Sequence, residues 1–304
     1  MAHAMADGLR AEYLQLEARP FTGSWTTVKL AGMVLQFGRE DVATVRRLRV
    51  PEDRAAIVVP IETTPLARWN ARPIGSHQLI ACLPGAECFA FDPGGTHFAI
   101  VSVPLASRTA AAVRHACGTS EGSAIITPPE MASLTLHRFL SEAADRLWTM
   151  AEGPRATRAI VDEGEQLLVS CLDSASALTP DGDSSAARSE IVRRAEEVYR
   201  SHVGDPVSIA ELSSLVGVSE RSLRNAFYDV YTTSPKRYLK LWQLHQVRRE
   251  LRAAHASVTD VATLHGFFEL GRFAGEYKAL FGEVPSATLH KARARNGAQT
   301  AGAA

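Results

Sequence analysis

Three polar side chains that can recognise nucleic-acid bases lie close together in the sequence, at Arg221, Arg224 and Asn225. A guanidinium can donate two parallel hydrogen bonds to guanine O6 and N7, and a carboxamide can pair in the same way with adenine N6 and N7. All three fall on the outward face of a helix that is predicted to begin after Ser219. The residue types therefore predict either base recognition or a plain solvated helix face, and the surrounding elements must decide between the two.

A second candidate is Arg272, on another predicted helix about fifty residues later. Its alternative role is an intramolecular ion pair with Glu269 or Glu276, which lie three residues before it and four residues after it. Three further cations lie at predicted turns or helix edges, where they would suit phosphates: Lys236, Arg237 and Lys278. Phosphate contacts position a protein on DNA without specifying the sequence.

An internal repeat places these residues on similar elements. A segment that begins at Ser208 matches one that begins at Ser257 at an offset of 49 residues, and after one inserted residue the offset becomes 50. In each copy a serine is a predicted N-cap with an acidic residue three positions later. Gly217 and Gly266 then fall where a short first helix must end, because glycine tolerates the left-handed conformation. A second helix follows each turn, which is the layout of a helix-turn-helix.

One predicted helix, from Pro235 to Ala254, joins the two copies. A helix of this length spans roughly 30 Å. Successive major-groove faces on one side of B-DNA lie about 34 Å apart. The repeat therefore predicts two recognition helices that can enter adjacent grooves of one duplex.

Residues 189–292 resemble the DNA-binding domain of the AraC/XylS family of transcription regulators. The segment Gly266–Phe273 together with Tyr277–Ser286 resembles the family signature closely. Two positions depart from the pattern: Gln243 stands where the family usually has Arg, and Ser213 where it prefers Ala. The resemblance implies base-reading roles for Arg221, Arg224 and Asn225, double-stranded DNA and RNA polymerase as partners, and no cofactor.

The second recognition helix has different outer residues, namely Gly271, Ala274 and Gly275. Two glycines in a helix cost about 1 kcal/mol each relative to alanine. We expect them to allow close approach of the backbone to DNA, so that this copy reads mainly shape and phosphate, with Arg272 as its one base reader.

The N-terminal half has a different pattern. Residues 24–105 contain short β-branched and apolar runs, such as Trp25–Phe37, separated by Gly and Pro turns, which predicts an antiparallel sandwich or barrel. This region resembles the cupin-like sensor domains of the same family. Two helices are predicted over 128–173, where they form a dimer surface or pack within one subunit. The expected fold class is α+β, with an effector-sensing or dimerisation domain at 15–175, a linker at 176–188 and the DNA-binding domain at 189–292.

Catalytic and metal chemistry has little support. Cys82, Cys88, Cys117 and Cys171 do not form a close pair, which indicates buried free thiols. His77, His97 and His115 are isolated, so we expect no metal site. Weak effector-binding candidates are Trp69 and His77, although packing roles are an alternative for both. The leading function is a ligand-responsive regulator; the alternatives are an N-terminal domain that only dimerises, or a catalytic domain fused to a DNA reader.

The distribution of charge also divides the chain at the end of the predicted linker, near Arg188. From Arg188 onward there are 17 Lys and Arg residues against 12 Asp and Glu residues, whereas residues 1–187 hold 16 and 21. A basic half joined to an acidic half is typical of a chain in which one domain meets a polyanion. The sequence shows neither a secretory signal nor an apolar run long enough for a membrane span, so we expect a cytoplasmic, nucleoid-associated bacterial protein.

Overall fold

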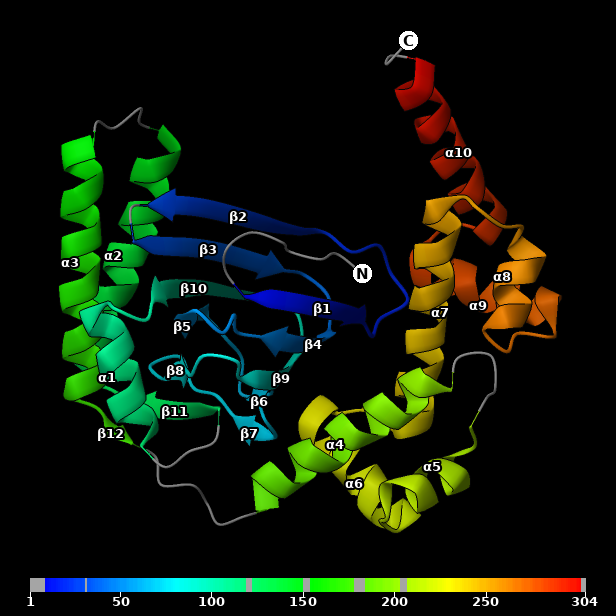
Figure 1. The fold of residues 1–304 in the computed structure, drawn as a ribbon, viewed down its shortest axis with the longest axis horizontal. Coiled ribbons are helices and arrows are strands. Elements are labelled where there is room, and N and C mark those ends of the chain that lie inside the picture. Colours follow the sequence, from blue (N-terminus) through cyan, green and yellow to red (C-terminus); the bar gives the residue numbers. More distant parts are fainter. Residues whose placement is uncertain are drawn as a thin grey trace. The chain divides into compact units, whose positions relative to one another are not determined.

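A computed structural model describes residues 9–301 apart from 31, 119–121, 150–153, 178–183 and 203–206. The chain forms two compact units (Figure 1). The N-terminal unit contains Thr22–Ser185 and the segment before Leu14, and the C-terminal unit contains Leu14–Phe21 and Ala186–Ala304. The division lies within the expected linker 176–188, of which residues 178–183 lie outside the described residues.

Two antiparallel sheets build the N-terminal unit. The smaller sheet has the order β1-β4-β9-β6-β7 and the larger has the order β12-β11-β8-β5-β10-β3-β2. The strands of the smaller sheet are β1 (Arg10–Gln15), β4 (Thr44–Arg49), β9 (Glu87–Asp92), β6 (Arg68–Trp69) and β7 (Arg72–Pro73). Those of the larger are β12 (Ser176–Ala177), β11 (Ser123–Thr127), β8 (Leu79–Cys82), β5 (Arg54–Glu62), β10 (Thr96–Pro104), β3 (Met33–Glu40) and β2 (Gly23–Leu30).

Strand β10 lies in the interior of the larger sheet between β3 and β5, where Val101 pairs with Leu35 on one side and Ile57 on the other. Because successive side chains point to opposite faces of a strand, Val101 packs with the helices. Its neighbour Ile100 belongs to the core that also contains Leu48 of the smaller sheet. Both faces of β10 are therefore buried, and the predicted α+β architecture is confirmed.

Three helices cover one face of the larger sheet: α1 (Arg108–Cys117), α2 (Glu130–Thr149) and α3 (Pro154–Asp173) (Figure 1). Helices α2 and α3 lie within the range expected for a helix pair, 128–173, and residues 150–153 between them lie outside the described residues. The apolar residues predicted on these helices pack into the core of the same chain, including Leu136, Leu140, Ile160 and Leu168. Their burial within one chain removes the observation that suggested a dimer surface on these stripes.

Several sequence expectations needed correction. The run Trp25–Phe37, expected to be one strand, is the hairpin β2–β3, which turns at Gly32 with a φ of 91°. Its apolar residues continue through the turn, so composition alone does not show the break. Strand β1, helix α1 and strand β11 were not predicted at all.

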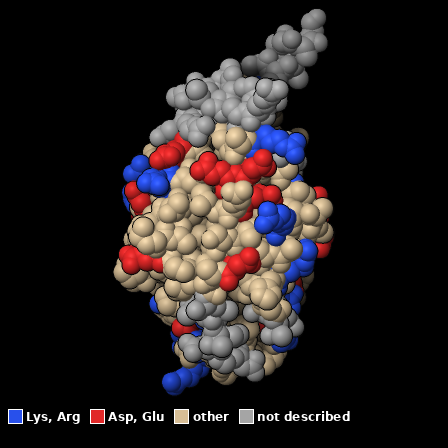
Figure 2. Space-filling view, turned by 90° about the vertical axis from the view of Figure 1, so that its left-hand side faces the viewer, with Lys and Arg blue, Asp and Glu red and all other residues tan. Residues whose placement is uncertain are grey.

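Charges of both signs are interspersed on the face of the N-terminal unit that carries α1 and α3, around a broad uncharged area (Figure 2). Such a surface differs from the continuous basic area expected of a DNA contact. Within the described part of the chain, no helix combines the length and the apolar character that crossing a membrane would require.

The C-terminal unit is helical. Its helices are α4 (Ser184–Ser201), α5 (Ile209–Val216), α6 (Glu220–Tyr231), α7 (Pro235–Ala253), α8 (Val258–Leu264), α9 (Leu270–Phe281) and α10 (Pro285–Ala301). The pairs α5–α6 and α8–α9 are the two predicted helix-turn-helix units, called here the first and second reading units.

Candidate nucleic-acid interface

Local sequence determines the first reading unit. The Ser208 side chain accepts the Glu211 amide, and the Glu211 carboxylate accepts the Ser208 amide, which completes the predicted capping box. Gly217 ends α5 in the left-handed conformation, with φ 75° and ψ 34°. Ser219 caps α6 by accepting the Ser222 amide. The turn between the helices is therefore fixed at both ends.

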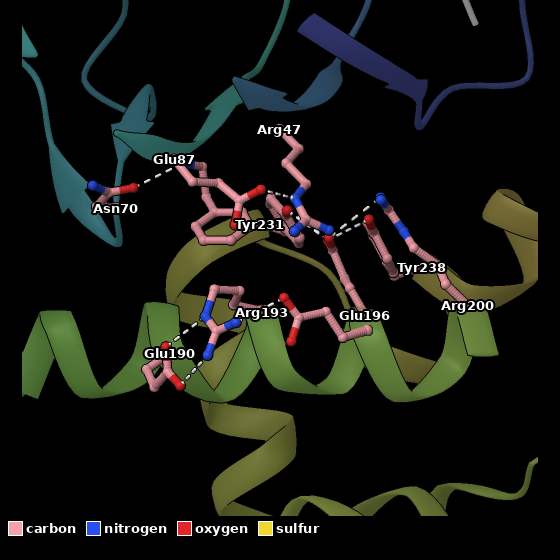
Figure 3. A network of polar contacts seen from close by, with 11 residues as sticks. Arg47, Asn70, Glu87, Glu190, Arg193, Glu196, Arg200, Tyr231 and Tyr238 are labelled. Atoms are coloured by element: carbon pink, nitrogen blue, oxygen red, sulfur yellow. Dashed lines mark hydrogen bonds and ion pairs between the residues drawn. The ribbon is translucent and has the colours of Figure 1, made fainter. Parts of the chain in front are cut away.

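The inner face of α6 is anchored on a buried carboxylate. Leu223, Phe227 and Val230 are fully buried, as predicted. Glu196 of α4 is 2% exposed and accepts hydrogen bonds from the phenols of Tyr231 and Tyr238 (Figure 3). Arg200 lies 3.5 Å from its other oxygen. Glu196 therefore ties α4, α6 and α7 together.

The role of Glu196 was not predicted from the sequence, because its partners Tyr231 and Tyr238 lie 35 and 42 residues later in the chain. Burial, with a further contribution from the Glu196 charge, raises the pKa of Tyr238 well above its usual value. The Tyr238 phenol therefore stays protonated and able to donate.

The outer face of α6 is open. Arg221, Arg224 and Asn225 are exposed. Among the described residues, none of these side chains has a recorded hydrogen bond or ion pair. Each arginine thus presents five N–H donors and the asparagine presents two, with no partner among the described residues to displace.

The second reading unit repeats the design with changes. Ser257 caps α8 by accepting the Asp260 amide and donating to the Asp260 carboxylate. Gly266 follows α8 with a φ of 79°, and Phe273 and Tyr277 are buried on α9. Glu269 takes the N-cap position of α9 but makes no side-chain capping bond.

Arg272 forms intramolecular ion pairs with Glu269 and Glu276, which was the alternative role considered for it from the sequence. Its Nε lies 3.1 Å from the Glu276 carboxylate and its Nη1 4.0 Å from that of Glu269. The Arg272 side chain is 71% exposed, and exposed pairs of this kind contribute only about 0–1 kcal/mol. Arg272 can therefore leave its carboxylates for a stronger partner at little cost. A Cβ added at Gly271 or Gly275 would meet nothing within 4 Å, so this face of α9 is unobstructed.

Helix α7 separates the two reading units by its own length. It has 19 residues, which corresponds to about 28 Å. Within the C-terminal unit, α6 lies near one end of α7 and α9 near the other (Figure 1). The predicted connector is confirmed.

The three expected phosphate-binding cations are all exposed. No partner is recorded for Lys236 or Lys278 among the described residues. The Arg237 guanidinium donates to the Leu16 backbone oxygen (2.9 Å), within the same compact unit. Use of Arg237 for phosphate requires that this bond break.

The N-terminal unit contains a cavity of about 50 Å³ between its sheets. Apolar residues such as Ile80 and Phe98 line it, together with Trp69. Trp69 is 4% exposed and donates its indole N–H to Ser123 (3.1 Å), so it also has a packing role. His77 is not among the lining residues; its ring lies 6.4 Å from that of His137 on α2.

A buried charge cluster at one wall of this cavity was not predicted. The Arg46 guanidinium lies 2.8 Å from Asp92 and 3.3 Å from Glu40, and 4.6 Å above the Phe98 ring. Burial raises the pKa of Glu40, and the Arg46 charge opposes that effect. Glu40 and Asp92 therefore neutralise the charge of Arg46 at this wall, while Arg68 and His97 also line the cavity.

All four cysteines are buried free thiols, as expected. Burial raises the pKa of both Cys117 and Cys171 to about 11. Among the described residues, no group of three or more His, Cys, Asp or Glu side chains gathers in a way that could hold a metal ion.

Comparison with known proteins finds similarity in the C-terminal region. Residues 212–291 match a family model described as a helix-turn-helix domain. The chain is 43% identical over 102 residues to a probable thc operon regulatory protein of Rhodococcus erythropolis, covering 33% of this chain and 31% of that protein. It is 39% identical over 90 residues to a XylDLEGF operon transcriptional activator of Pseudomonas putida, covering 29% and 28%. The match therefore spans less than a third of each relative.

Two solved structures are also among the matches. A probable AraC family transcriptional regulator from Rhodopseudomonas palustris is 33% identical, with a TM-score of 0.31, over 34% of this chain and 96% of that one. ToxT from Vibrio cholerae is 9% identical, with a TM-score of 0.31, over 93% of this chain and 98% of that one.

Proposed function

We propose that the protein is a sequence-specific DNA-binding transcription regulator of the AraC/XylS type, because residues 212–291 match a helix-turn-helix domain and the similar proteins are operon regulators. The observation that carries this proposal is the outer face of α6, where Arg221, Arg224 and Asn225 are exposed and have no hydrogen-bond or ion-pair partner among the described residues. These are the side chains suited to guanine and adenine edges in the major groove.

On this proposal the two reading units enter adjacent major grooves on one face of a duplex. The α6 face selects bases, while α9 approaches the backbone closely through Gly271 and Gly275, with Arg272 released from Glu276. Lys236, Arg237 and Lys278 neutralise phosphates and fix the register.

Selection of binding sites from a random duplex library tests the proposal directly. The full-length protein is expected to enrich one sequence with two half-sites. A variant that carries Arg221→Ala, Arg224→Ala and Asn225→Ala is expected to lose preference at one half-site only. Failure of the full-length protein to enrich any sequence would contradict the proposal.

The N-terminal unit is proposed to be the effector-sensing domain, at residues 15–175, joined through 176–188 to the DNA-binding domain at 189–292. The cavity lined by Trp69 and Phe98 supports this role. A ligand that binds only the folded state raises the melting temperature. A screen of neutral, cationic and anionic metabolites is expected to find at least one that stabilises the protein, and Trp69→Ala is expected to remove that stabilisation.

The alternative without an effector is a domain that only dimerises. Met131 and Leu134 on α2 are 74% and 44% exposed, which leaves an apolar surface outside the core stripe. We propose that this surface contributes to a homodimer. Sedimentation of the full-length protein at micromolar concentration is expected to show a dimer that Met131→Glu with Leu134→Glu dissociates; a monomeric wild type would contradict it.

The alternative of a catalytic domain fused to a DNA reader needs an accessible, activated cysteine. Burial of all four thiols disfavours that alternative. The further partner proposed is RNA polymerase, with the protein acting as an activator in the cytoplasm in association with the nucleoid. In vitro transcription with purified polymerase is expected to rise when the protein occupies its site.

A further inference from the structure

The two reading units differ by one residue in their turns, and the backbone identifies which one. In the first unit the Val218 amide donates to the Ser213 oxygen (3.0 Å); in the second, the Phe267 amide donates to the Ala262 oxygen (2.9 Å). Phe267 therefore takes the place of Val218. The N-cap follows Val218 immediately, at Ser219, but in the second unit it lies two residues after Phe267, at Glu269. Phe268 is the inserted residue.

Phe268 is 69% exposed, whereas the preceding Phe267 is 6% exposed and packs on the ring of Phe273. No ring contact is recorded for Phe268 among the described residues. A single exposed apolar residue is ordinary on a protein surface. The position of Phe268 gives it significance: it lies at the N-terminal end of a recognition helix, the part that meets base edges in helix-turn-helix complexes.

The adjoining face of α9 has little capacity for hydrogen-bonded readout. The positions equivalent to Arg221, Arg224 and Asn225 are Gly271, Ala274 and Gly275. Arg272, which in the free protein forms weak exposed pairs with Glu269 and Glu276, is therefore the one hydrogen-bonding side chain expected to read bases from this helix. Leu270, the first residue of the helix, is 39% exposed. The reading edge of the second unit is thus apolar where that of the first is polar.

The one apolar feature that a base presents in the major groove is the thymine methyl group, and phenylalanine is among the side chains that contact it. We infer that Phe268 recognises thymine methyl groups in the half-site bound by the second reading unit. This inference rests on the proposed function. It makes Phe268 a specificity-determining residue: the first unit selects guanine and adenine by hydrogen bonds, and the second selects thymine by apolar contact.

Replacement of thymine by deoxyuridine removes only the methyl group and tests this directly. Each thymine of the selected duplex is replaced in turn, and affinity for full-length protein is measured by fluorescence anisotropy. The half-site of the first unit is the one where Arg224→Ala relaxes base preference. At one or more thymines of the other half-site, the replacement is expected to weaken wild-type binding about fourfold, the value of one buried methyl group.

Phe268→Ala is expected to abolish that difference, so that the variant binds the thymine and deoxyuridine duplexes alike. Leu264→Ala, at a leucine of α8 that is 51% exposed, is the matched control and is expected to keep the fourfold ratio. Phe268→Leu, which retains an apolar side chain, is expected to keep part of the difference in affinity between the thymine and deoxyuridine duplexes. Melting temperatures of the variants report folding separately.

An unchanged thymine-to-deoxyuridine ratio in Phe268→Ala overturns the inference and leaves the proposed function intact. The inference is also overturned, with the proposed function intact, if Phe268→Ala preserves DNA affinity but lowers transcription with purified polymerase. Phe268 would then contact a protein and not DNA. If the wild type enriches no sequence at all, both the proposed function and this inference are wrong.

Discussion

Replacement of Arg224 by alanine separates base recognition from general electrostatic attraction. The Arg224 side chain is exposed and has no recorded partner among the described residues, so its loss breaks no intramolecular bond. Surface substitutions of this kind change stability by about 0.5 kcal/mol or less. A bidentate arginine–guanine pair contributes about 1–3 kcal/mol of discrimination, which is roughly 5- to 150-fold in affinity.

The assay compares Arg224→Ala with wild type on the selected duplex and on a scrambled duplex at several salt concentrations. The expected result is a loss within that range on the selected duplex and a much smaller loss on the scrambled one. Lys236→Ala is the matched control: it is expected to weaken both duplexes alike and to reduce the slope of log K against log salt by about 0.9. An equal loss on both duplexes in Arg224→Ala would refute direct base recognition by this residue.

Two further predictions concern stability. Arg46→Met leaves the carboxylates of Glu40 and Asp92 buried without a cation and is expected to lower the free energy of unfolding by about 3–5 kcal/mol in denaturant titrations. Arg49→Met on the same strand removes only an exposed pair and is expected to cost less than about 1 kcal/mol, so similar losses would contradict the buried-cluster account. Burial holds the pKa of His245 well below its usual value, so below about pH 6.5 the unfolded chain binds this proton and the folded chain does not. As the pH is lowered from about 6.5 towards the folded pKa, the free energy of unfolding therefore decreases by up to about 1.4 kcal/mol per pH unit. His245→Gln is expected to lose that part of the pH dependence, and parallel wild-type and variant curves between pH 6.5 and 5 would count against it.

Features set by nearby residues could be predicted from the sequence. The serine caps, the left-handed glycines and the spacing of Leu223 and Phe227 each depend on contacts within one or two helical turns. These contacts are enough to define both reading units and the connector between them. The repeat also shows that one residue is inserted, but only the hydrogen bond from the Phe267 amide to the Ala262 oxygen identifies that residue as Phe268.

Features set by distant pairing could not be predicted in the same way. Arg46 and Asp92 are brought together by the register of β4 against β9, 46 residues apart. Glu196 meets Tyr231 across 35 residues, and Arg237 reaches Leu16 across 221. The sequence suggests that such charged residues are exposed to solvent, but in the fold Arg46 and Glu196 are buried and Arg237 is hydrogen-bonded. No local sequence pattern distinguishes these residues from exposed ones.

Hydroxyl-radical footprinting of the full-length protein on its selected duplex tests most directly whether both reading units bind one DNA at once. Two protected segments are expected on the same face, with centres about 10–10.5 bp apart, and insertion of five base pairs between them is expected to lose one segment and lower affinity. A single protected segment, or an affinity unaffected by the insertion, would contradict the account.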